Sequence, residues 1–458
     1  MLDALADLPH AFLLHSALPS ARARWSFFGA DPFAWYRGER YDDAVALWRR
    51  LAAQEHGAPG APTPPAPFTG GAVGAWAYDF GRRLERLPVR ARDDLALPDF
   101  VLGFYDVVGA IDHDTGANWL FSSGLPLAGT ERAVRAEERL EAFARRIESH
   151  APVPAPAETW VTGEPVSTFE RAGYLAAVER VKDHIRRGDI FQANLSQRWT
   201  ARVAPPAGAD GTSTAALGRA LFGALARRSP APHAAYLDAG DHAVVSASPE
   251  RFLELRGSRV ETRPIKGTRP RGRTPSEDAA LRRELAASAK DRAENVMIVD
   301  VLRNDLGRVC AAGSVRTTGL CELEAFPQVF HLTSTVTGEL GPKLDAIDLL
   351  HACFPGGSIT GAPKIRAMEI IESLEPVRRH LYTGAIGYLD WSGDADWNIA
   401  IRTALVTPGA IHFAAGGGIT SDSDPEAEYA ETLHKAAGLR TALADLATAP
   451  AAPATAVR

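Results

Sequence analysis

Apolar residues recur with a helical period in the middle of the chain, most clearly after residue 170. One face of this stretch carries Tyr174, Val178, Val181 and Ile185. Spacings of three and four residues place side chains on one face of a helix. Ser167 and Glu170 have the S-x-x-E spacing of a capping box, and Gly188 suits a helix end. The pattern therefore predicts a helix that starts near Glu170 and stops near Gly188.

The remaining pattern predicts strands and helices in separate runs. Further helices are expected over 277–289, within 291–306, and over 362–374 and 425–439. Strands are expected over 25–29, 101–111, 243–247, 252–255, 385–391, 399–406 and 411–415. Because the two kinds of element do not alternate strictly, the pattern favours an α+β architecture over a doubly wound sheet.

Proline-rich stretches divide the chain. Residues 56–67, 151–157 and 205–214 hold too many prolines and small residues for a helix or a central strand. They predict linkers, with an N-terminal segment over residues 1–150 and a longer domain over residues 166–446. The tail, residues 447–458, is expected to be disordered.

Composition narrows the class of protein. Of 458 residues, 46% are hydrophobic and 23% are charged, which is typical of a globular protein with a large core. The net charge of −6 and the lack of a basic tract argue against nucleic-acid binding. No run reaches the ~18 apolar residues of a membrane helix, and no signal peptide is recognisable. A soluble cytoplasmic protein is predicted.

Lys266 lies in an unusual segment, PIKGTRPRG over residues 264–272. A lysine amine is a nucleophile only when it is neutral, and nearby cations together with burial lower its pKa. Arg263, Arg269 and Arg271 are expected to supply that positive field and to attract an anionic substrate. The alternative from spacing alone is a solvated basic turn.

Carboxylates on two predicted helices suggest a metal site. Asp424 and Pro425 are suited to start a helix in which Glu431 and Lys435 share a face with Glu428. Glu294 belongs to an apolar helical stretch. Glu294 and Glu431 together would suit Mg²⁺, which takes one or two carboxylates. The alternative is that both residues form surface salt bridges.

Four other polar positions are candidates for anion binding or proton transfer. His331 precedes a strand-like run, Arg402 lies within an apolar strand-like run, and Tyr382 and Ser358 offer hydroxyl groups. Gly416, Gly417 and Gly418 would expose backbone N–H groups in a turn. Each has a structural alternative, such as a side chain that reaches solvent from a strand end. The segment GGSITGAPK, residues 356–364, lacks the lysine and hydroxyl residue of a phosphate loop, so nucleotide binding is rejected.

Taken together, several segments resemble the chorismate-utilising enzymes. They are GDIFQANLSQR (188–198), SPERF (248–252), PIKGTRPRG (264–272), AENVMIVDVLRNDLG (293–307), HLTSTVTG (331–338), FPGGSITGAPK (354–364), NIAIRT (398–403) and GGGITSDSDPEAEYAET (416–432). The resemblance implies the anthranilate-synthase-like fold, two antiparallel β-sheets that form a sandwich with helices packed outside. It is looser near the N-terminus, where His15 replaces the glutamate typical of tryptophan-inhibited relatives.

Two positions discriminate within this family. Lysine at position 266 is typical of relatives that aminate chorismate at C4 on the route to para-aminobenzoate, whereas anthranilate synthases carry a small residue. Isochorismate-forming relatives use a lysine base at the position of Gln192, and a glutamine cannot replace it. The resemblance therefore implies amination at C4 to give 4-amino-4-deoxychorismate. Anthranilate synthase component I and a non-catalytic chorismate- or tryptophan-binding regulator are the alternatives.

The resemblance also implies roles for individual residues. Lys266 would form a covalent adduct at C2, with Glu250 as acid and base and with His331 and Ser358 beside the departing hydroxyl. Mg²⁺ would be held by Glu294 and Glu431. The substrate carboxylate would be bound by Tyr382, Arg402, Gly416, Gly417, Gly418 and Lys435. No cysteine stands in a G-x-C-x-G elbow, so a separate glutamine amidotransferase subunit is expected to supply ammonia.

Overall fold

The structure, a computed structural model, describes residues 1–18, 23–55, 64–150, 160–204, 213–326 and 329–447. Most of the predicted linker residues in 56–67, 151–157 and 205–214 lie outside the described residues, and so does the predicted disordered tail from residue 448 onward.

The first of two large sheets has 12 strands, and all its pairings are antiparallel. Its main path runs β18-β10-β22-β21-β12-β11-β1-β2-β6-β7, and β8 and β9 pair with β10. The strands are β1 (Phe12–His15), β2 (Trp25–Gly29), β6 (Val107–Asp112), β7 (Asn118–Ser122), β8 (Val161–Thr162), β9 (Val166–Ser167), β10 (Gln192–Ala204), β11 (His233–Asp238), β12 (Ala243–Ser248), β18 (Gly361–Ala362), β21 (Thr403–Thr407) and β22 (Ala410–Ile419).

The second sheet has 10 strands in the order β15-β17-β14-β13-β20-β19-β4-β5-β3, with β16 paired to β17. The strands are β3 (Ala34–Arg37), β4 (Gly71–Trp76), β5 (Phe100–Tyr105), β13 (Arg251–Arg256), β14 (Arg259–Thr262), β15 (Ile265–Pro270), β16 (Arg316–Ala325), β17 (Val329–Glu339), β19 (Ala385–Asp390) and β20 (Ala395–Ile399). Both sheets combine strands from the N-terminal segment and the longer part, since β1 pairs with β11 and β4 with β19.

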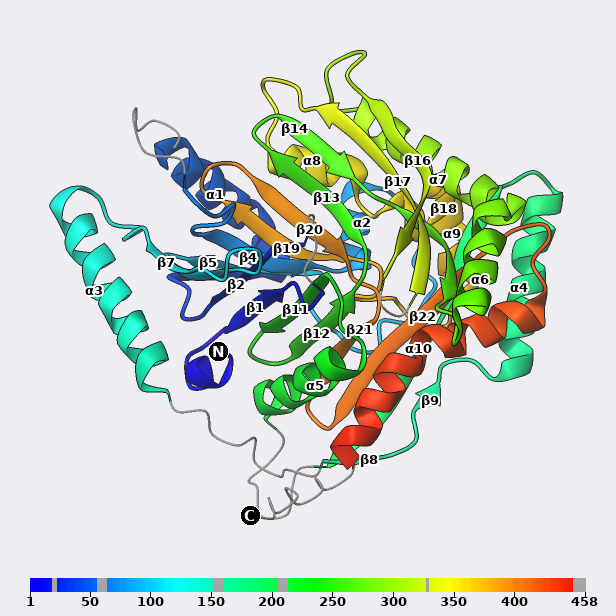
Figure 1. Ribbon diagram of the computed structural model, residues 1–458, viewed down its shortest axis with the longest axis horizontal. Helices are drawn as coiled ribbons and strands as arrows, with labels where there is room; N and C mark the ends of the chain where they lie inside the picture. Colours follow the sequence, from blue (N-terminus) through cyan, green and yellow to red (C-terminus); the bar gives the residue numbers. More distant parts are fainter. Residues whose placement is uncertain (19–22, 56–63, 151–159, 205–212, 327–328, 448–458) are drawn as a thin grey trace.

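Helices cover the outer faces of the two sheets (Figure 1). They are α1 (Tyr41–Glu55), α2 (Gly81–Leu84), α3 (Gly129–Ser149), α4 (Arg171–Arg186), α5 (Thr214–Arg228), α6 (Pro275–Ala287), α7 (Ala289–Gly307), α8 (Ala346–Cys353), α9 (Lys364–Leu374) and α10 (Pro425–Ala447). Within the described residues, no helix combines the length and apolar character that a bilayer crossing requires.

Three of the five apolar clusters among the described residues join these layers. Side chains from β1, β2, β11 and β12 pack against side chains from β4, β5 and β19 between the sheets. A second core joins the first sheet to α5 and α10, and a third joins the second sheet to α1, α7 and α8. The predicted α+β sandwich with helices outside is therefore confirmed.

Several local predictions are wrong. The single strand expected over 101–111 is instead β5 and β6, which belong to different sheets. Ser167 does not cap α4, because it belongs to β9 and its hydroxyl donates to Gln197 of β10 at 2.6 Å. The single strand expected over 399–406 is interrupted between β20 and β21. Arg402 has φ of +50° there, a left-handed conformation that breaks a strand.

Candidate active site

Lys266 lies in β15, and its side chain reaches the short helix η4 (Gly357–Ile359). Its Nζ donates a hydrogen bond to the carbonyl oxygen of Ser358 at 2.9 Å. The Ser358 hydroxyl donates in turn to Oε1 of Glu250 at 2.7 Å. Ser358 and Glu250 are both buried. The fold thus brings three predicted site residues from distant parts of the sequence into direct contact.

The surroundings of Lys266 lower its pKa below the ordinary value. Burial has the largest influence and lowers the pKa, the negative charge of Glu294 raises it, and the positive charge of Lys435 lowers it. A lower pKa increases the neutral fraction of the amine at a given pH, and only the neutral amine is a nucleophile. The surroundings of Lys266 therefore favour the neutral amine more than water does.

The predicted source of this effect is wrong, because the three arginines of the segment are neutralised by carboxylates. Their partners are Glu324 for Arg263 at 2.5 Å, Glu284 for Arg269 at 2.7 Å and Asp278 for Arg271 at 2.7 Å. The alternative of a solvated turn is equally wrong, since Lys266 occupies a strand that pairs with β17. Burial and Lys435 replace the predicted arginine field.

Glu250 lies between β12 and β13, where 5% of its surface is exposed. Burial raises the pKa of its carboxyl group, while the Ser358 hydrogen bond and the positive charge of Lys266 oppose that rise. A raised pKa lets a carboxyl group hold a proton closer to neutral pH and then release it. Glu250 therefore has the properties of an acid/base group.

His331 of β17 and Arg402 are close enough for the charge of Arg402 to act on the imidazole ring. Burial, and then the positive charge of Arg402, lower the pKa of His331 to about 4. The ring is therefore neutral at pH 7, and its Nδ1 lies 2.8 Å from the Thr268 hydroxyl. The guanidinium of Arg402 has no hydrogen bond or ion pair with any other described residue. A largely buried arginine without a partner suits an anionic ligand.

Tyr382 precedes β19 and is buried with 8% of its surface exposed. Its ring packs against the guanidinium of Arg379, with 5.8 Å between Cζ and the ring centroid. Burial raises the pKa of its hydroxyl, and the negative charge of Glu431 adds to the rise. Tyr382 therefore keeps its hydroxyl proton at neutral pH, and it is close enough to Glu431 for that charge to influence its pKa.

Glutamates from α7 and α10 border one space. The ammonium of Lys290 lies 4.0 Å from Glu294 and 3.9 Å from Glu428, so these two carboxylates face each other across it. Glu431 pairs with Lys435 at 2.6 Å. Burial raises the pKa of Glu294, whose side chain is only 16% exposed. Of these carboxylates, Glu431 has a close cation in Lys435, whereas Glu294 has only the distant ammonium of Lys290, which leaves room for a bound cation beside it.

The glycine run lies in β22 and not in the predicted turn, with Gly416, Gly417 and Gly418 opposite Ser196, Leu195 and Asn194 of β10. On its other edge β22 pairs with β21 only as far as Phe413, so the glycine edge has no strand partner among the described residues. A Cβ on Gly417 would lie 2.8 Å from Glu428. The glycines therefore leave room beside the carboxylates.

The donor set is compatible with Mg²⁺. Among the residues that the structure describes, no group of three or more His, Cys, Asp or Glu is arranged to hold a metal ion. Mg²⁺ usually needs fewer protein ligands, because water and substrate oxygens complete its octahedral shell. Glu294 and Glu431, with the space that Gly417 leaves open, fit this requirement.

Four residues of this region were not predicted as site residues, although Glu428 was placed on the same helix face as Glu431 and Gln192 was used to distinguish relatives. Glu428 is buried and accepts a hydrogen bond from Ser423 at 2.6 Å, and Lys290 in the first turn of α7 reaches to 3.9 Å from Glu428 of α10. Gln192 and Asn194 are buried with unsatisfied amide oxygens. The i, i+3 spacing of Glu428 and Glu431 was a signal for Glu428. No strand was predicted over β10, so the alternation that places Gln192 and Asn194 on one face was not recognised.

A large cavity lies elsewhere, between the two sheets. It has a volume of about 950 Å³ and is lined by His15, Arg24 and Trp25 of the first sheet side and by Arg256 and Tyr388 of the second, among others. None of the predicted catalytic, metal or substrate residues lines it. The hydroxyl of Ser26 bridges His15 and His113 at its wall, at 2.8 and 2.6 Å.

Comparison with known proteins identifies relatives along nearly the whole chain. The family model described as chorismate binding enzyme matches residues 14–441. The chain is 41% identical to aminodeoxychorismate synthase component 1 of Klebsiella aerogenes, over 94% of this chain and 93% of that protein. It is 39% identical to anthranilate synthase component 1 of Mycobacterium tuberculosis, over 96% and 88%. The crystal structure of anthranilate synthase component I from Streptococcus pneumoniae superposes with a TM-score of 0.77 at 31% identity, over 92% and 93%.

Proposed function

Because this chain belongs to the family of chorismate binding enzymes, we propose that it aminates chorismate at C4 and forms 4-amino-4-deoxychorismate. Identities of 41% and 39% hardly separate the two kinds of relative. The observation that carries the choice is the amine of Lys266, which has a lowered pKa and lies 2.9 Å from the Ser358 carbonyl beside Glu250. An enzyme that adds ammonia directly at C2 has no use for a nucleophile there.

The reaction proceeds in two displacements. The lone pair of Lys266 Nζ forms a bond to C2, the two ring double bonds shift, and the C4–oxygen bond breaks. Glu250 gives its proton to the departing hydroxyl, which leaves as water. Ser358, by turning its hydroxyl away from Glu250, and neutral His331 donate hydrogen bonds to that oxygen. The secondary ammonium formed at Nζ then returns a proton to Glu250, so the adduct carries a neutral amine. Ammonia then bonds to C4, the double bonds return, and the C2–Nζ bond breaks. Covalent catalysis of this kind divides one difficult step into two easier ones.

Chorismate carries two carboxylates, and the pocket offers cations for both. Arg402, the Tyr382 hydroxyl and the N–H groups of Gly416 to Gly418 bind the enolpyruvyl carboxylate, with Lys435 nearby. Glu294 and Glu431 would hold Mg²⁺, which would supply positive charge to neutralise the ring carboxylate. Fixing both ends of the substrate aligns C2 with the amine of Lys266.

Ammonia is supplied by a second protein. Relatives are named component 1, which implies a partner component. No cysteine of this sequence lies in a glutaminase-type elbow. A glutamine amidotransferase subunit therefore docks on this chain and releases ammonia into the pocket.

The test is a product assay with the purified chain, chorismate, Mg²⁺ and ammonium chloride. The proposal predicts a product that yields para-aminobenzoate only after an aminodeoxychorismate lyase is added. Direct appearance of fluorescent anthranilate would overturn the choice in favour of the other relative. Binding of chorismate without any consumption would indicate a regulator.

A further inference from the structure

Two buried side-chain amide oxygens beside the proposed active site have no hydrogen-bond partner in the described part of the chain. Gln192 and Asn194 are 1% and 6% exposed, yet Oε1 of Gln192 and Oδ1 of Asn194 accept no hydrogen bond from any described residue. Buried polar atoms are nearly always satisfied, because leaving one unpaired costs about 1–3 kcal/mol. Two such atoms in adjacent inward positions point to a ligand that donates hydrogen bonds.

The two amides face the same space. Alternate residues of a strand project to one side at about 7 Å apart, so the side chains at positions 192 and 194 share a face of β10. Both lie against the glycines of β22. A Cβ on Gly418 would lie 2.0 Å from Nε2 of Gln192, and a Cβ on Gly416 would lie 2.9 Å from Oδ1 of Asn194.

This space adjoins the reacting groups. The backbone N–H of Asn194 donates to the carbonyl of Thr360 at 2.9 Å, two residues beyond Ser358. The carbonyl of Gly416 accepts from Lys435 at 2.9 Å, and the charge of Lys435 influences the pKa of both Lys266 and Glu250. The amide pair therefore lies between the nucleophile loop and the glycine strand.

We infer that Gln192 and Asn194 form the binding site for ammonia, the second substrate of the proposed reaction, on which this inference rests. Ammonia has three N–H donors and one lone pair. Two donors satisfy the orphaned oxygens, and the lone pair is left free for C4. The nitrogen forms its bond to C4 as the C2–Nζ bond breaks and its electron pair returns to Lys266. The new ammonium group then loses one proton and Lys266 regains one, so charge balances.

A matched control lies on the same strand. Gln197 is also a buried glutamine of β10, but its amide is satisfied by Ser167 and Thr432 at 2.6 and 2.7 Å. Its replacement removes a buried amide of the same size without touching the proposed ammonia site. Any general effect of disturbing β10 appears in both variants, whereas an effect on ammonia appears in only one.

The experiment measures KM for ammonium and KM for chorismate separately, each with the other substrate at saturation. We expect Gln192→Met and Asn194→Leu to raise KM for ammonium about tenfold, the equivalent of about one lost hydrogen bond to a polar donor. KM for chorismate and the yield of the Lys266 adduct without ammonia stay unchanged. Gln197→Met leaves both KM values unchanged. Gln192→Glu, which keeps an acceptor oxygen, holds KM for ammonium at or below that of the wild type.

Other outcomes overturn the inference. An unchanged KM for ammonium in both variants would do so, and so would a raised KM for chorismate in Gln192→Glu, because a carboxylate there would then repel a substrate carboxylate. Failure of the proposed function gives a different result, which is seen in the product of the wild type. If the wild type forms anthranilate, the proposed function is wrong but the ammonium KM still tests this site. If the wild type aminates nothing, both are wrong.

Discussion

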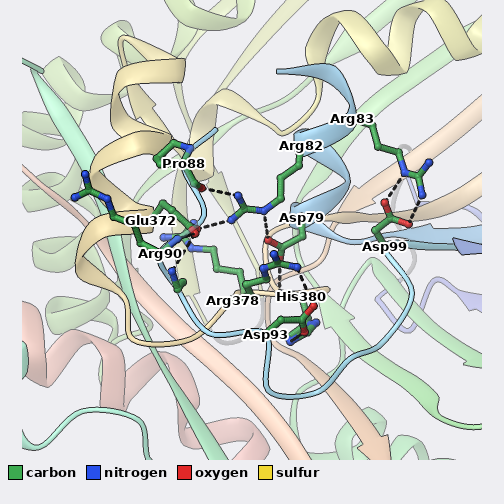
Figure 2. A network of polar contacts seen from close by, with 12 residues as sticks. Asp79, Arg82, Arg83, Pro88, Arg90, Asp93, Asp99, Glu372, Arg378 and His380 are labelled. Atoms are coloured by element: carbon green, nitrogen blue, oxygen red, sulfur yellow. Dashed lines mark hydrogen bonds and ion pairs between the residues drawn. The ribbon is translucent and has the colours of Figure 1, made fainter. Parts of the chain in front are cut away.

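Buried charged side chains are fully paired in one region of this molecule and lack close partners in another. At the junction of α2 and α9, Glu372 accepts hydrogen bonds from Arg82 at 2.5 Å and from the N–H groups of Arg90 and Ala91 at 2.8 and 3.0 Å (Figure 2). In the pocket, the carboxylate of Glu294 accepts no hydrogen bond from the described residues, and its ion-pair partner Lys290 is 4.0 Å away.

The difference separates structural charges from functional ones. Arg82 also pairs with Asp79 at 3.0 Å, and Asp79 accepts the backbone N–H of His380 at 2.9 Å, so the network ties distant segments together. A buried charge that is fully paired costs little, whereas an unpaired one is expensive. Glu294 and Arg402 are left without close partners by the described residues, as charged groups of binding sites often are, and this agrees with the roles proposed for them.

The largest effect is expected for the nucleophile. Lys266→Met removes the amine but keeps the length of the side chain, so the rate of 4-amino-4-deoxychorismate formation should fall at least about 10³-fold. Intact mass spectrometry of enzyme mixed with chorismate without ammonia should show added mass on the wild type and none on the variant. Lys343→Met, at an exposed position before α8, should behave as the wild type. Normal turnover by Lys266→Met would refute the covalent mechanism.

The paired network should respond with stability and not with catalysis. Arg82→Met leaves Glu372 and Asp79, with 7% and 9% of their side chains exposed, without their shared cation. The expected loss is about 3 kcal/mol of unfolding free energy, measured by denaturant titration. The folded fraction of Arg82→Met should keep the wild-type KM for chorismate. Arg50→Met on the exposed side of α1 should cost almost nothing. A large change in KM for Arg82→Met would contradict the division between the two regions.

Replacement of Glu294, which lacks a close partner, should change Mg²⁺ affinity and not stability. Glu294→Gln removes one proposed ligand of Mg²⁺, and the affinity for Mg²⁺ should fall about 100-fold in calorimetric titration of the protein in the presence of chorismate. The burial of an unpaired charge is relieved at the same time, so the unfolding free energy should stay equal or rise slightly. The matched change in the network, Glu372→Gln, should lower stability and leave Mg²⁺ affinity unchanged. Unaltered Mg²⁺ binding by Glu294→Gln would remove this residue from the metal site.

The same contrast explains what the sequence could reveal. Periodicity located α4, and motif resemblance collected Lys266, Glu250 and Glu294, because spacing within one segment is a local property. Partners from distant segments are not local. The arginines near Lys266 looked like its electrostatic environment, yet each pairs with a carboxylate from another element. The left-handed turn at Arg402 is likewise imposed by the junction of two sheets, since its apolar neighbours alone predict a continuous strand.

The smallest expected effect concerns the cation next to the nucleophile. Lys435 lowers the pKa of Lys266, and it also neutralises Glu431 at 2.6 Å. Lys435→Met removes the repulsion and leaves Glu431 free to stabilise the protonated amine, so both changes raise the pKa of Lys266. Adduct formation needs the neutral amine, so its rate is lost as pH falls through this pKa, and the acid limb of the variant should lie at higher pH. The measurement is a single turnover of chorismate without ammonia across a pH series, since ammonia would itself titrate. Lys343→Met provides the control, and a limb that stays in place or moves to lower pH would show that burial alone depresses this amine.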